Sequence, residues 1–278
     1  MKHSDQTLFE GIEQSTIILD GHHCTLPLFY TAGTATIGMF PANLSKLKHK
    51  SPDSRLQPAA TMPGVGIVTV IAFEFETTIG PVNEVCVAVP LHTPGLPFGI
   101  SMLQSLLRGY LPVWIWHLPV STEIADIFGR ATWGFPKILA DIPITQHADG
   151  RRDCLLSQHG QPILALHSHA LNGKRDLKVT LKNHLWQNGA LQTADHIFAM
   201  HDIGFSITPG ASRLELLSDH PIARDLDDVL LTKSSLISAF APSLEAILHE
   251  PDRMSLSLAR QLLSASPEFT NNTLEMGD

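Results

Sequence analysis

The stretch GVGIVTVIAFEFETT, from Gly64 to Thr78, predicts a β-strand, because β-branched and aromatic residues dominate it. Near its end two phenylalanines alternate with two glutamates, which is the period of a strand with two different faces. The turn-forming residues Ile79-Gly80-Pro81 come next, and the apolar stretch VNEVCVAVPL follows at residues 82–91. These features predict two antiparallel strands joined by a tight turn.

Similar short stretches recur along the chain, often with glycine or proline between them. They are LPVWIWHLPV (111–120), DCLLSQHG (153–160), PILALHSHAL (162–171), DLKVTLKNHLW (176–186) and SRLELLS (212–218). Many short strands separated by turn residues indicate a β-barrel or a β-sandwich.

Few helices are expected, and all are short. Ser121 or Thr122 is a suitable N-cap for a helix of a turn or two that ends at Gly129. Helical spacing also predicts helices over residues 100–110, 234–250 with a break at Pro242, and 255–265.

No sharp shift in composition divides the chain. We therefore expect a single domain over residues 1–278. It would carry a polar N-terminal extension over about residues 1–25 and a mobile C-terminal tail over about residues 266–278.

The composition indicates a globular protein that acts on something small. Of the 278 residues 44% are hydrophobic, which is enough for a sizeable core. The formal net charge of -8 argues against a nucleic-acid partner, because nucleic acids attract basic surfaces. No apolar run reaches the roughly 20 residues that span a bilayer, and the first residues do not resemble a secretory signal. The three cysteines form no disulfide pattern, so we expect a reducing, cytoplasmic setting without membrane contact.

Lys137 stands in an otherwise apolar run, FGRATWGFPKILADIPI, at residues 128–144. Most lysines face water, so a solvated turn residue is the ordinary interpretation. If its apolar neighbours enclose the amine, however, burial destabilises the ammonium and favours the neutral form. A neutral amine attacks carbonyl carbons and forms a Schiff base, whose protonated imine draws electrons from a bond one carbon away.

Glu84 is a carboxylate in a strand whose two faces are both mostly apolar. A carboxylate at such a position must be paired, neutralised or solvated by a cavity. In a partly dry cavity it is suited to move protons. The alternative is a glutamate that caps the adjoining loop, and the strand by itself favours this alternative.

Several stretches occur in the same order as in one known family. They are FYTAGTATIGMFPANL (29–44), GPVNEVCVAVPL (80–91), GRATWGFPKILADIPI (129–144) and GASRLELLSDHPIARDLDDV (210–229). With them the chain resembles the acetoacetate decarboxylase family over most of its length. The resemblance implies a mainly β (α+β) fold, an acetoacetate decarboxylase-like antiparallel β-barrel with a few peripheral helices. It also implies assembly as a homo-oligomer.

In that family one lysine forms the Schiff base, and a second lysine directly after it favours the neutral form of the first. The resemblance assigns the first lysine to Lys137 and the active-site glutamate to Glu84. Three other positions depart from the family's pattern. The second lysine is Ile138 here, the arginine that would hold a substrate carboxylate falls at Tyr30, and a second acid falls near Thr69.

These departures change the expected chemistry. Without the second lysine, Lys137 depends on burial alone to become neutral, and Ile138 would help by excluding water. Without the arginine, a small β-keto acid lacks its bidentate anchor. A long connection after the glutamate strand contains Arg108, a candidate replacement, although an exposed place near a helix end is the more usual position of an arginine.

We therefore predict a Schiff-base-forming carbon–carbon lyase that acts on a keto acid or a related carbonyl compound by decarboxylase-type chemistry. The expected nucleophile is Lys137, and the expected proton carrier is Glu84. The candidate substrate-binding residues are Tyr30, Trp133, Phe135, Ile138 and Arg108. Two alternatives stay open: an aldolase or aldol-dehydratase that uses the same lysine imine, and a non-catalytic barrel that binds a small ligand.

Fifteen histidines raise the question of a metal site. His167 and His169 would share one face of a strand, and His22 and His23 are adjacent, but neither pair has a carboxylate or cysteine partner at ligand spacing. No glycine-rich loop stands in the strand–helix context of a nucleotide site. We expect neither a metal nor an organic cofactor, and histidines that are hydrogen-bonded or solvated.

Overall fold

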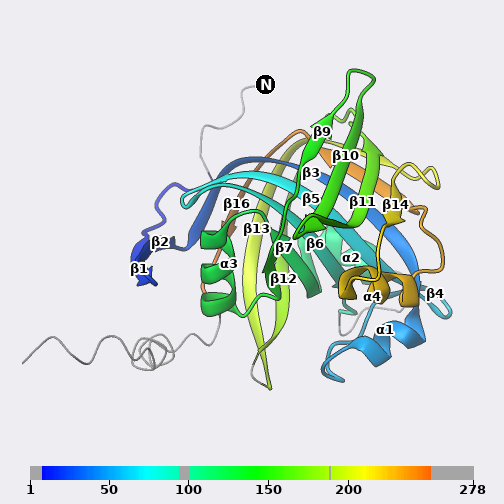
Figure 1. Cartoon of the computed structure of the whole chain (residues 1–278), viewed down its shortest axis with the longest axis horizontal. Coiled ribbons are helices and arrows are strands. Elements are labelled where there is room, and N and C mark those ends of the chain that lie inside the picture. Colours follow the sequence, from blue (N-terminus) through cyan, green and yellow to red (C-terminus); the bar gives the residue numbers. More distant parts are fainter. Residues whose placement is uncertain (1–7, 94–100, 188, 252–278) are drawn as a thin grey trace, which may run out of the picture.

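The computed structural model of this chain describes residues 8–93, 101–187 and 189–251 (Figure 1). Within these ranges the fold is mainly β with few and short helices, as predicted. The helices are α1 (Leu44–Lys50), α2 (Ser101–Leu107), α3 (Glu123–Phe128), a π-helical turn directly after α3 (Gly129–Trp133) and α4 (Pro221–Val229). No helix in the described ranges is both long enough and apolar enough to cross a lipid bilayer.

Ten strands of the described residues form the main sheet. They are β3 (Leu28–Asn43), β4 (Ala60–Met62), β5 (Val65–Thr77), β6 (Gly80–Pro90), β7 (Tyr110–Val120), β8 (Lys137–Leu139), β12 (Arg175–Gln187), β13 (Ala190–Ser206), β15 (Ile237–Ala241) and β16 (Ser243–Leu248). Neighbours pair in the order β15-β3-β16-β13-β12-β7-β6-β5-β4, with β8 beside β7, and β5 also pairs with β3.

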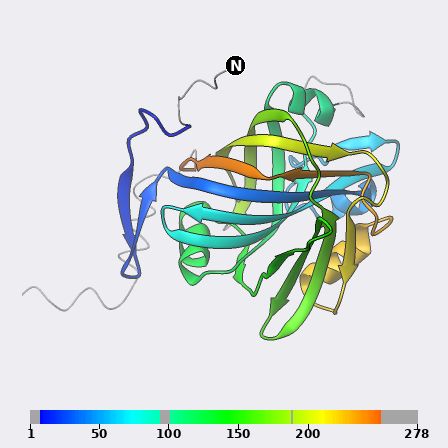
Figure 2. The same cartoon turned by 90° about the horizontal axis from the view of Figure 1, so that it is seen from above.

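The main sheet is strongly curved. Because β5 pairs with β3, the series of pairings from β3 through β16, β13, β12, β7, β6 and β5 returns to β3, and the strands surround an interior (Figure 2). The pairs are antiparallel except those that β7 makes with β12 and with β8, which are parallel. The predicted pair of strands at residues 64–91 is β5 and β6, with Phe73 opposite Glu84.

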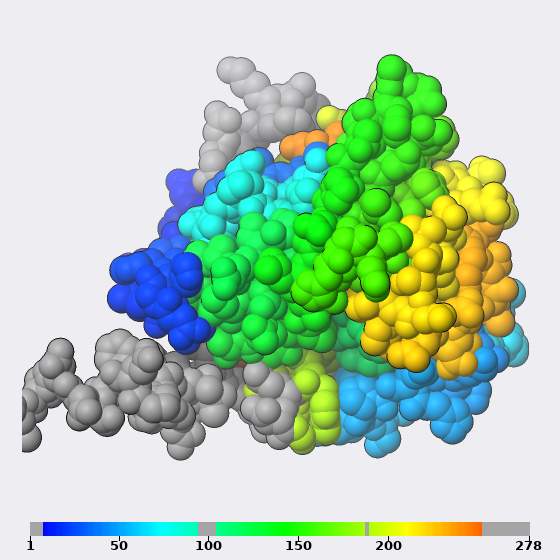
Figure 3. Space-filling model, in the orientation of Figure 1, coloured from blue at the N-terminus to red at the C-terminus, as the bar shows by residue number. Residues whose placement is uncertain are grey.

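A second sheet lies outside the main sheet. It contains β9 (Ile144–Gln146), β10 (Arg151–Gln158), β11 (Gln161–His169) and β14 (Arg213–Leu216), in the order β14-β11-β10-β9. In the space-filling view the atoms of this sheet and of α4 stand in front of the main sheet and cover part of it from that side (Figure 3).

The buried apolar side chains form two large clusters on opposite faces of the main sheet. The inner cluster lies inside the curved sheet and is rich in aromatic residues, such as Phe73 and Phe198. The outer cluster lies between the main sheet, the second sheet and helices α1 and α4, and includes Leu47, Leu156 and Leu226.

Strand β6 contributes to both clusters, because successive side chains of a strand point to opposite faces. Cys86 and Ala88 belong to the inner cluster, whereas Val85, Val87 and Val89 belong to the outer cluster. The apolar residues on both faces of this strand, which the sequence analysis noted, are therefore covered on both sides.

Part of the expected N-terminal extension is ordered as a hairpin. Strands β1 (Ser15–Leu19) and β2 (His22–Leu26) are antiparallel and lead directly into β3. Cys24 and Leu26 belong to the inner cluster, so the end of this hairpin is part of the core.

The prediction of a helix over residues 234–250 is wrong. The segment contains β15 and β16, which pair with β3 and β13. Ala239 and Ala241 before Pro242, and Leu244, Ala246 and Leu248 after it, reach the inner cluster at every second position. This period of two is typical of strands. Because the segment is so apolar, its residues also fit a helical spacing, and the sequence pattern did not distinguish the two.

Other helix predictions differ in detail. The chain does not end its helix at Gly129 but continues as the π-helical turn to Trp133. Helices α1 and α4 were not expected, and residues 213–216 of the strand predicted at 212–218 are a strand. The helix predicted at 255–265 and the predicted tail lie outside the described residues.

Candidate functional site

Lys137 is the first residue of β8, directly after the segment that follows the π-helical turn. Gly134 has a φ of 75°, a left-handed conformation that favours glycine, so the chain can turn from the helix toward the sheet. β8 then lies parallel to β7, with Lys137 beside Leu118. The lysine side chain lies in the interior of the main sheet, and the residue is only 9% exposed.

In this interior Lys137 meets Glu84. The Lys137 Nζ donates a hydrogen bond to the Glu84 Oε2 at 3.2 Å, and the glutamate is only 6% exposed. Glu84 lies on the interior face of β6, between Phe73 of β5 and Val120 of β7. Buried charges are stable when they are paired, and the hydrogen bond gives a proton a direct path between the two groups. The predicted pair is therefore assembled from residues that are far apart in sequence.

The path of the lysine stem depends on Gly129 in the π-helical turn. A Cβ atom added at Gly129 would lie 2.3 Å from Cδ and 2.5 Å from Cε of Lys137. No side chain larger than hydrogen fits there unless the lysine moves. The glycine thus brings helix backbone against the lysine methylenes and holds the amine at Glu84.

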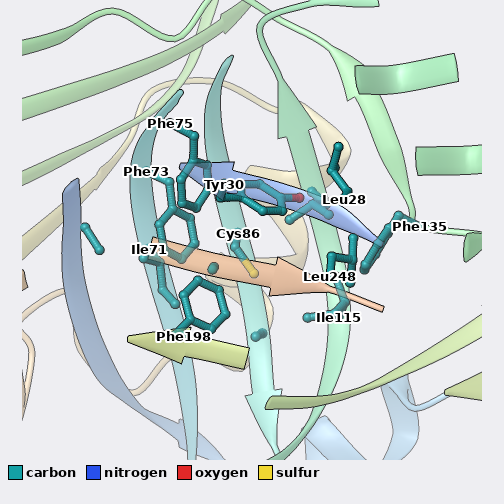
Figure 4. Packing of buried hydrophobic residues seen from close by; sticks show 14 of the residues in the cluster. Leu28, Tyr30, Ile71, Phe73, Phe75, Cys86, Ile115, Phe135, Phe198 and Leu248 are labelled. Atoms are coloured by element: carbon teal, nitrogen blue, oxygen red, sulfur yellow. The ribbon is translucent and has the colours of Figure 1, made fainter. Parts of the chain in front are cut away.

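A cavity of about 440 Å³ opens from this ion pair into the interior of the main sheet. Apart from Lys137 and Glu84, its lining is dominated by side chains of the inner cluster. Figure 4 shows these side chains, with Ile71, Phe73 and Phe198 gathered near Cys86. An amine and a carboxylate at the wall of an apolar cavity are thus available to a ligand, whereas most of the surface around them excludes water.

Tyr30 and Phe135, two predicted binding residues, both line the cavity. The Tyr30 ring packs edge-on against Phe75 at 4.6 Å between ring centroids. Burial raises the pKa of the Tyr30 hydroxyl well above its ordinary value, and the negative charge of Glu84 acts in the same direction. Tyr30 therefore remains a neutral phenol that can donate a hydrogen bond. It cannot replace the positive charge of an arginine.

His196 of β13 is a cavity residue that the sequence analysis missed. Its ring packs between Tyr30 and Phe198, at 5.0 Å and 4.1 Å between ring centroids, and its buried Nε2 has no hydrogen-bond partner among the described residues. Burial lowers the pKa of His196 to about 3, and the positive charge of Lys137 acts in the same direction. A neutral imidazole with a free ring nitrogen thus lies in the same cavity as the amine. Recognition of β13 as a strand, with His196 and Phe198 on one face, is the signal that could have found it.

Three predicted binding residues, Ile138, Arg108 and Trp133, lie outside the cavity, so these expectations are corrected. Ile138 follows Lys137 directly in β8, and because successive strand residues point to opposite faces, its side chain packs against the outer cluster. It does not dry the space around the amine. Arg108, just after α2, is exposed and is not part of the cavity lining, so the surface interpretation fits it better.

Trp133 is near the ion pair but has a structural contact of its own. It is fully buried, and its Nε1 donates a hydrogen bond to the backbone oxygen of His249 at 2.7 Å. It lines a second, very small recess that also touches Lys137 and Glu84. Trp133 therefore packs beneath the pair and outside the main cavity.

Positive charge is sparse along the cavity. Among the described lining residues, the lysine and arginine side chains are Lys137 and Arg175, and Arg175 is exposed at the start of β12. The position that the resemblance assigned to a carboxylate-binding arginine is Tyr30, and Thr69 lines the cavity without an acidic group. Lys137 is thus the cation nearest to any ligand atom bound beside Glu84.

No three histidine, cysteine, aspartate or glutamate side chains are arranged to hold a metal ion in the part of the chain that the structure describes. His167 lies with Nδ1 2.8 Å from Asp153 and Nε2 3.5 Å from Glu215, so both of its nitrogens face carboxylates. His167 thus lies among carboxylates, and none of these three residues lines the cavity.

Comparison with known proteins gives one family and several similar structures. The model of the family described as acetoacetate decarboxylase (ADC) matches residues 23–224 of this chain. A search of curated proteins gave no match.

Three solved structures illustrate the structural similarity. The enduracididine biosynthesis enzyme MppR complexed with pyruvate aligns with a TM-score of 0.57 and 15% identity, over 81% of this chain and 89% of its own. An acetoacetate decarboxylase from Legionella pneumophila aligns with a TM-score of 0.54 and 16% identity, over 81% and 86% of the two chains. MppR complexed with the condensation product of pyruvate and imidazole 4-carboxaldehyde aligns with a TM-score of 0.54 and 13% identity, over 81% and 88%. At these identities the similarity is one of fold.

Proposed function

This chain belongs to the acetoacetate decarboxylase family, and from that premise we propose that it is a Schiff-base-forming carbon–carbon lyase acting on a keto acid or a related carbonyl compound. Lys137 is the proposed nucleophile, and Glu84 is the proposed proton carrier. The observation that supports these roles is the pair itself, a buried amine and a buried carboxylate 3.2 Å apart at the wall of an apolar cavity.

In the proposed reaction the Lys137 ammonium first gives a proton to Glu84, and the neutral amine then attacks the keto carbon of a β-keto acid. The resulting carbinolamine loses water and becomes a protonated imine. The bond between the α-carbon and the carboxylate breaks, carbon dioxide leaves, and the bonding electrons move toward the imine nitrogen to form an enamine. Protonation of the α-carbon and hydrolysis of the imine release the ketone and the free amine.

Glu84 suits the proton transfers because it already accepts a hydrogen bond from the amine. It can take the proton that the amine must lose, and it can return a proton to the enamine carbon. The apolar lining supports both steps, because in a dry site the charges of the iminium and of the carboxylate interact more strongly than in water.

The sparse positive charge of the cavity favours a second candidate, aldol-type chemistry through the same imine. A β-keto acid bound at Lys137 would bring a carboxylate to a place where the described residues offer no arginine. A neutral ketone or aldehyde needs no such anchor. Its enamine would attack the carbonyl carbon of a second molecule, and the new bond would be a carbon–carbon bond. One of the similar structures, MppR, is described with a condensation product of pyruvate and an aldehyde.

Reductive trapping tests the shared imine. Incubation with a panel of keto acids and ketones, followed by borohydride, is expected to give an adduct whose mass spectrum places it on Lys137. The Lys137→Met variant removes the amine and is expected to abolish the adduct. Lys182→Met is the matched control, because Lys182 lies on β12 between the cavity-lining Leu181 and Asn183 but does not itself line the cavity.

The product separates the candidates. Release of carbon dioxide with the adduct supports decarboxylation, whereas exchange or condensation with an added aldehyde supports the aldol alternative. An adduct that persists in Lys137→Met, or no adduct with any carbonyl compound in the panel, contradicts the proposal. The second outcome leaves the non-catalytic ligand-binding barrel.

A further inference from the structure

The cavity is long, and the ion pair lies near one of its ends. Along the interior face of β6 the lining includes Glu84, Cys86, Ala88 and Pro90 in succession. At about 3.3 Å per residue, this part of a strand covers on the order of 20 Å. Lys137 lies at the Glu84 end, beside the last residues of β7.

The other end of the cavity reaches the surface. Leu107 of α2 and Phe205 of β13 both line the cavity, although they are 79% and 55% exposed. Exposed apolar side chains at the rim of an apolar cavity are typical of sites that bind apolar molecules. The entrance thus carries exposed apolar side chains together with the charged residues Arg175 and Asp176, whereas the interior is mostly apolar.

Few polar groups lie between the entrance and the ion pair. Among the described residues with polar side chains, the lining away from the entrance contains Thr69, Asn183 and His196 in addition to Tyr30 and the ion pair. The rest is aliphatic, aromatic or sulfur-containing. A ligand with several hydroxyl or charged groups would leave most of them without partners, at a cost in binding free energy for each one.

The volume also exceeds the needs of a small keto acid. At about 30 Å³ per water-sized group, 440 Å³ has room for on the order of fifteen such groups. A molecule as small as acetoacetate bound at Lys137 would leave much of this apolar space empty of ligand.

We propose that the carbonyl compound bound at Lys137 carries an unbranched apolar tail of medium length, which extends along β6 and β13 to the entrance at Leu107 and Phe205. This proposal rests on the proposed function, because it places the carbonyl group at the lysine. It adds the class of substrate: a medium-chain 3-oxo acid or the corresponding methyl ketone. Burial of the tail supplies the binding energy that a carboxylate anchor would supply for a small acid.

A homologous series of ketones tests the tail. Borohydride trapping on Lys137 is measured with 2-alkanones from acetone to 2-dodecanone, and the half-saturating concentration is determined for each. We expect this concentration to fall about fourfold with each added methylene group until the cavity is filled, and then to level off. A concentration that does not change with chain length, or that rises, overturns the proposal.

A variant that blocks the cavity sharpens the test. Ala88→Leu adds a side chain in the middle of the lined part of β6, so we expect the gain with chain length to stop at a shorter ketone than in the wild type. Ala190→Leu, at an exposed position, is the matched control and should keep the original profile. Circular dichroism verifies folding, and Ala239→Leu from β15 narrows the same cavity if Ala88→Leu does not fold. An unchanged profile in a folded blocking variant contradicts the proposal.

A probe that forms no imine distinguishes an error in the proposed tail-binding site from an error in the proposed lysine chemistry. Displacement of an apolar fluorescent dye by 1-alkanols of the same lengths uses no imine, and it can be measured in Lys137→Met. Length-dependent displacement without any trapped ketone supports the apolar tail site and contradicts the proposed function. Trapping without length dependence in either assay supports the lysine chemistry and contradicts the tail.

Discussion

The inner and outer clusters take alternate residues from the same strands, yet they form two different kinds of interior. In the outer cluster Leu156 and Leu164 of the second sheet and Leu226 of α4 have no exposed surface, and they pack against the main sheet. The inner cluster instead surrounds a cavity of about 440 Å³. The main sheet thus uses one face for stability and keeps the other incompletely filled, and the groups with candidate chemistry lie on the second face.

Buried polar groups follow the same division. Arg152, which packs outside the main sheet, donates hydrogen bonds to Glu74, Gln146 and two threonine side chains. His196, on the inner side, has a buried Nε2 without a partner among the described residues. A buried polar group with a full set of partners stabilises the fold, whereas one without a partner is available to a ligand.

The largest expected effect is on the rate of adduct formation, when the carboxylate of the buried ion pair on the inner side is removed. Glu84→Gln keeps the size of the side chain but removes the group that accepts the amine's proton. We expect the rate of adduct formation on Lys137 to fall by about 10²- to 10⁴-fold. Rapid-quench borohydride trapping measures it. Glu74→Gln, on the outward face of β5, is the control and should leave the rate unchanged, and an equal loss in both variants would refute a specific role of Glu84.

A smaller effect is expected on the free energy of unfolding when a leucine is shortened, and it should differ between the outer and the inner cluster. Leu156→Ala removes a side chain from the closed outer cluster, and we expect the free energy of unfolding to fall by about 2–5 kcal/mol. Leu111→Ala, at a leucine that lines the cavity, should cost clearly less, because one side of this leucine already lacks protein contacts. Urea denaturation of both variants gives the two values. Equal losses would mean that the inner side is packed as tightly as the outer side.

The smallest effect concerns acid stability and His196. Its pKa is about 3 in the folded protein, against an ordinary value of about 6.5 in the unfolded chain. Between these pH values the unfolded state binds more protons, so the stability present above about pH 6.5 is lost as the pH falls toward 3. Between pH 7 and pH 5 this histidine should account for about 2 kcal/mol of the loss.

The comparison of His196→Asn with the wild type isolates this contribution. The variant should lose less stability than the wild type between pH 7 and pH 5 in urea denaturation. His201→Asn, at a more exposed position on the same strand, serves as the control and should behave as the wild type does. The same acid sensitivity in all three proteins would contradict a buried neutral His196.

The sequence was sufficient for the parts that depend on local pattern or on the family resemblance. The β5–β6 pair follows from alternation and turn residues, and the family's motifs single out Lys137 and Glu84, whose side chains lie 3.2 Å apart. The apolar run around Lys137 correctly suggested burial. Because successive side chains of a strand point to opposite faces, burial of Lys137 on the inner face of β8 also implies that Ile138 lies on the outer face, contrary to the sequence prediction.

The rest depends on packing between distant segments. Residues 234–250 are apolar enough to match helical and strand periods alike, and pairing with β3 and β13 decides between them. His196 lies in the cavity because β13 curves between β12 and β16. No local sequence pattern predicts this arrangement. The volume of the cavity likewise results from the curvature of the whole main sheet. Such features follow from tertiary structure, which overrides local propensity.

The alternation of β6 between the two clusters has a consequence for how this chain can diverge. Deletion or insertion of one residue directly after Glu84 would turn every later side chain of the strand to the opposite face. The valines of the outer cluster would then enter the cavity, and Cys86 and Ala88 would face the outer cluster. Homologues should therefore differ in β6 by exchange of side chains and keep its length, while gains and losses of residues accumulate in the connections between strands.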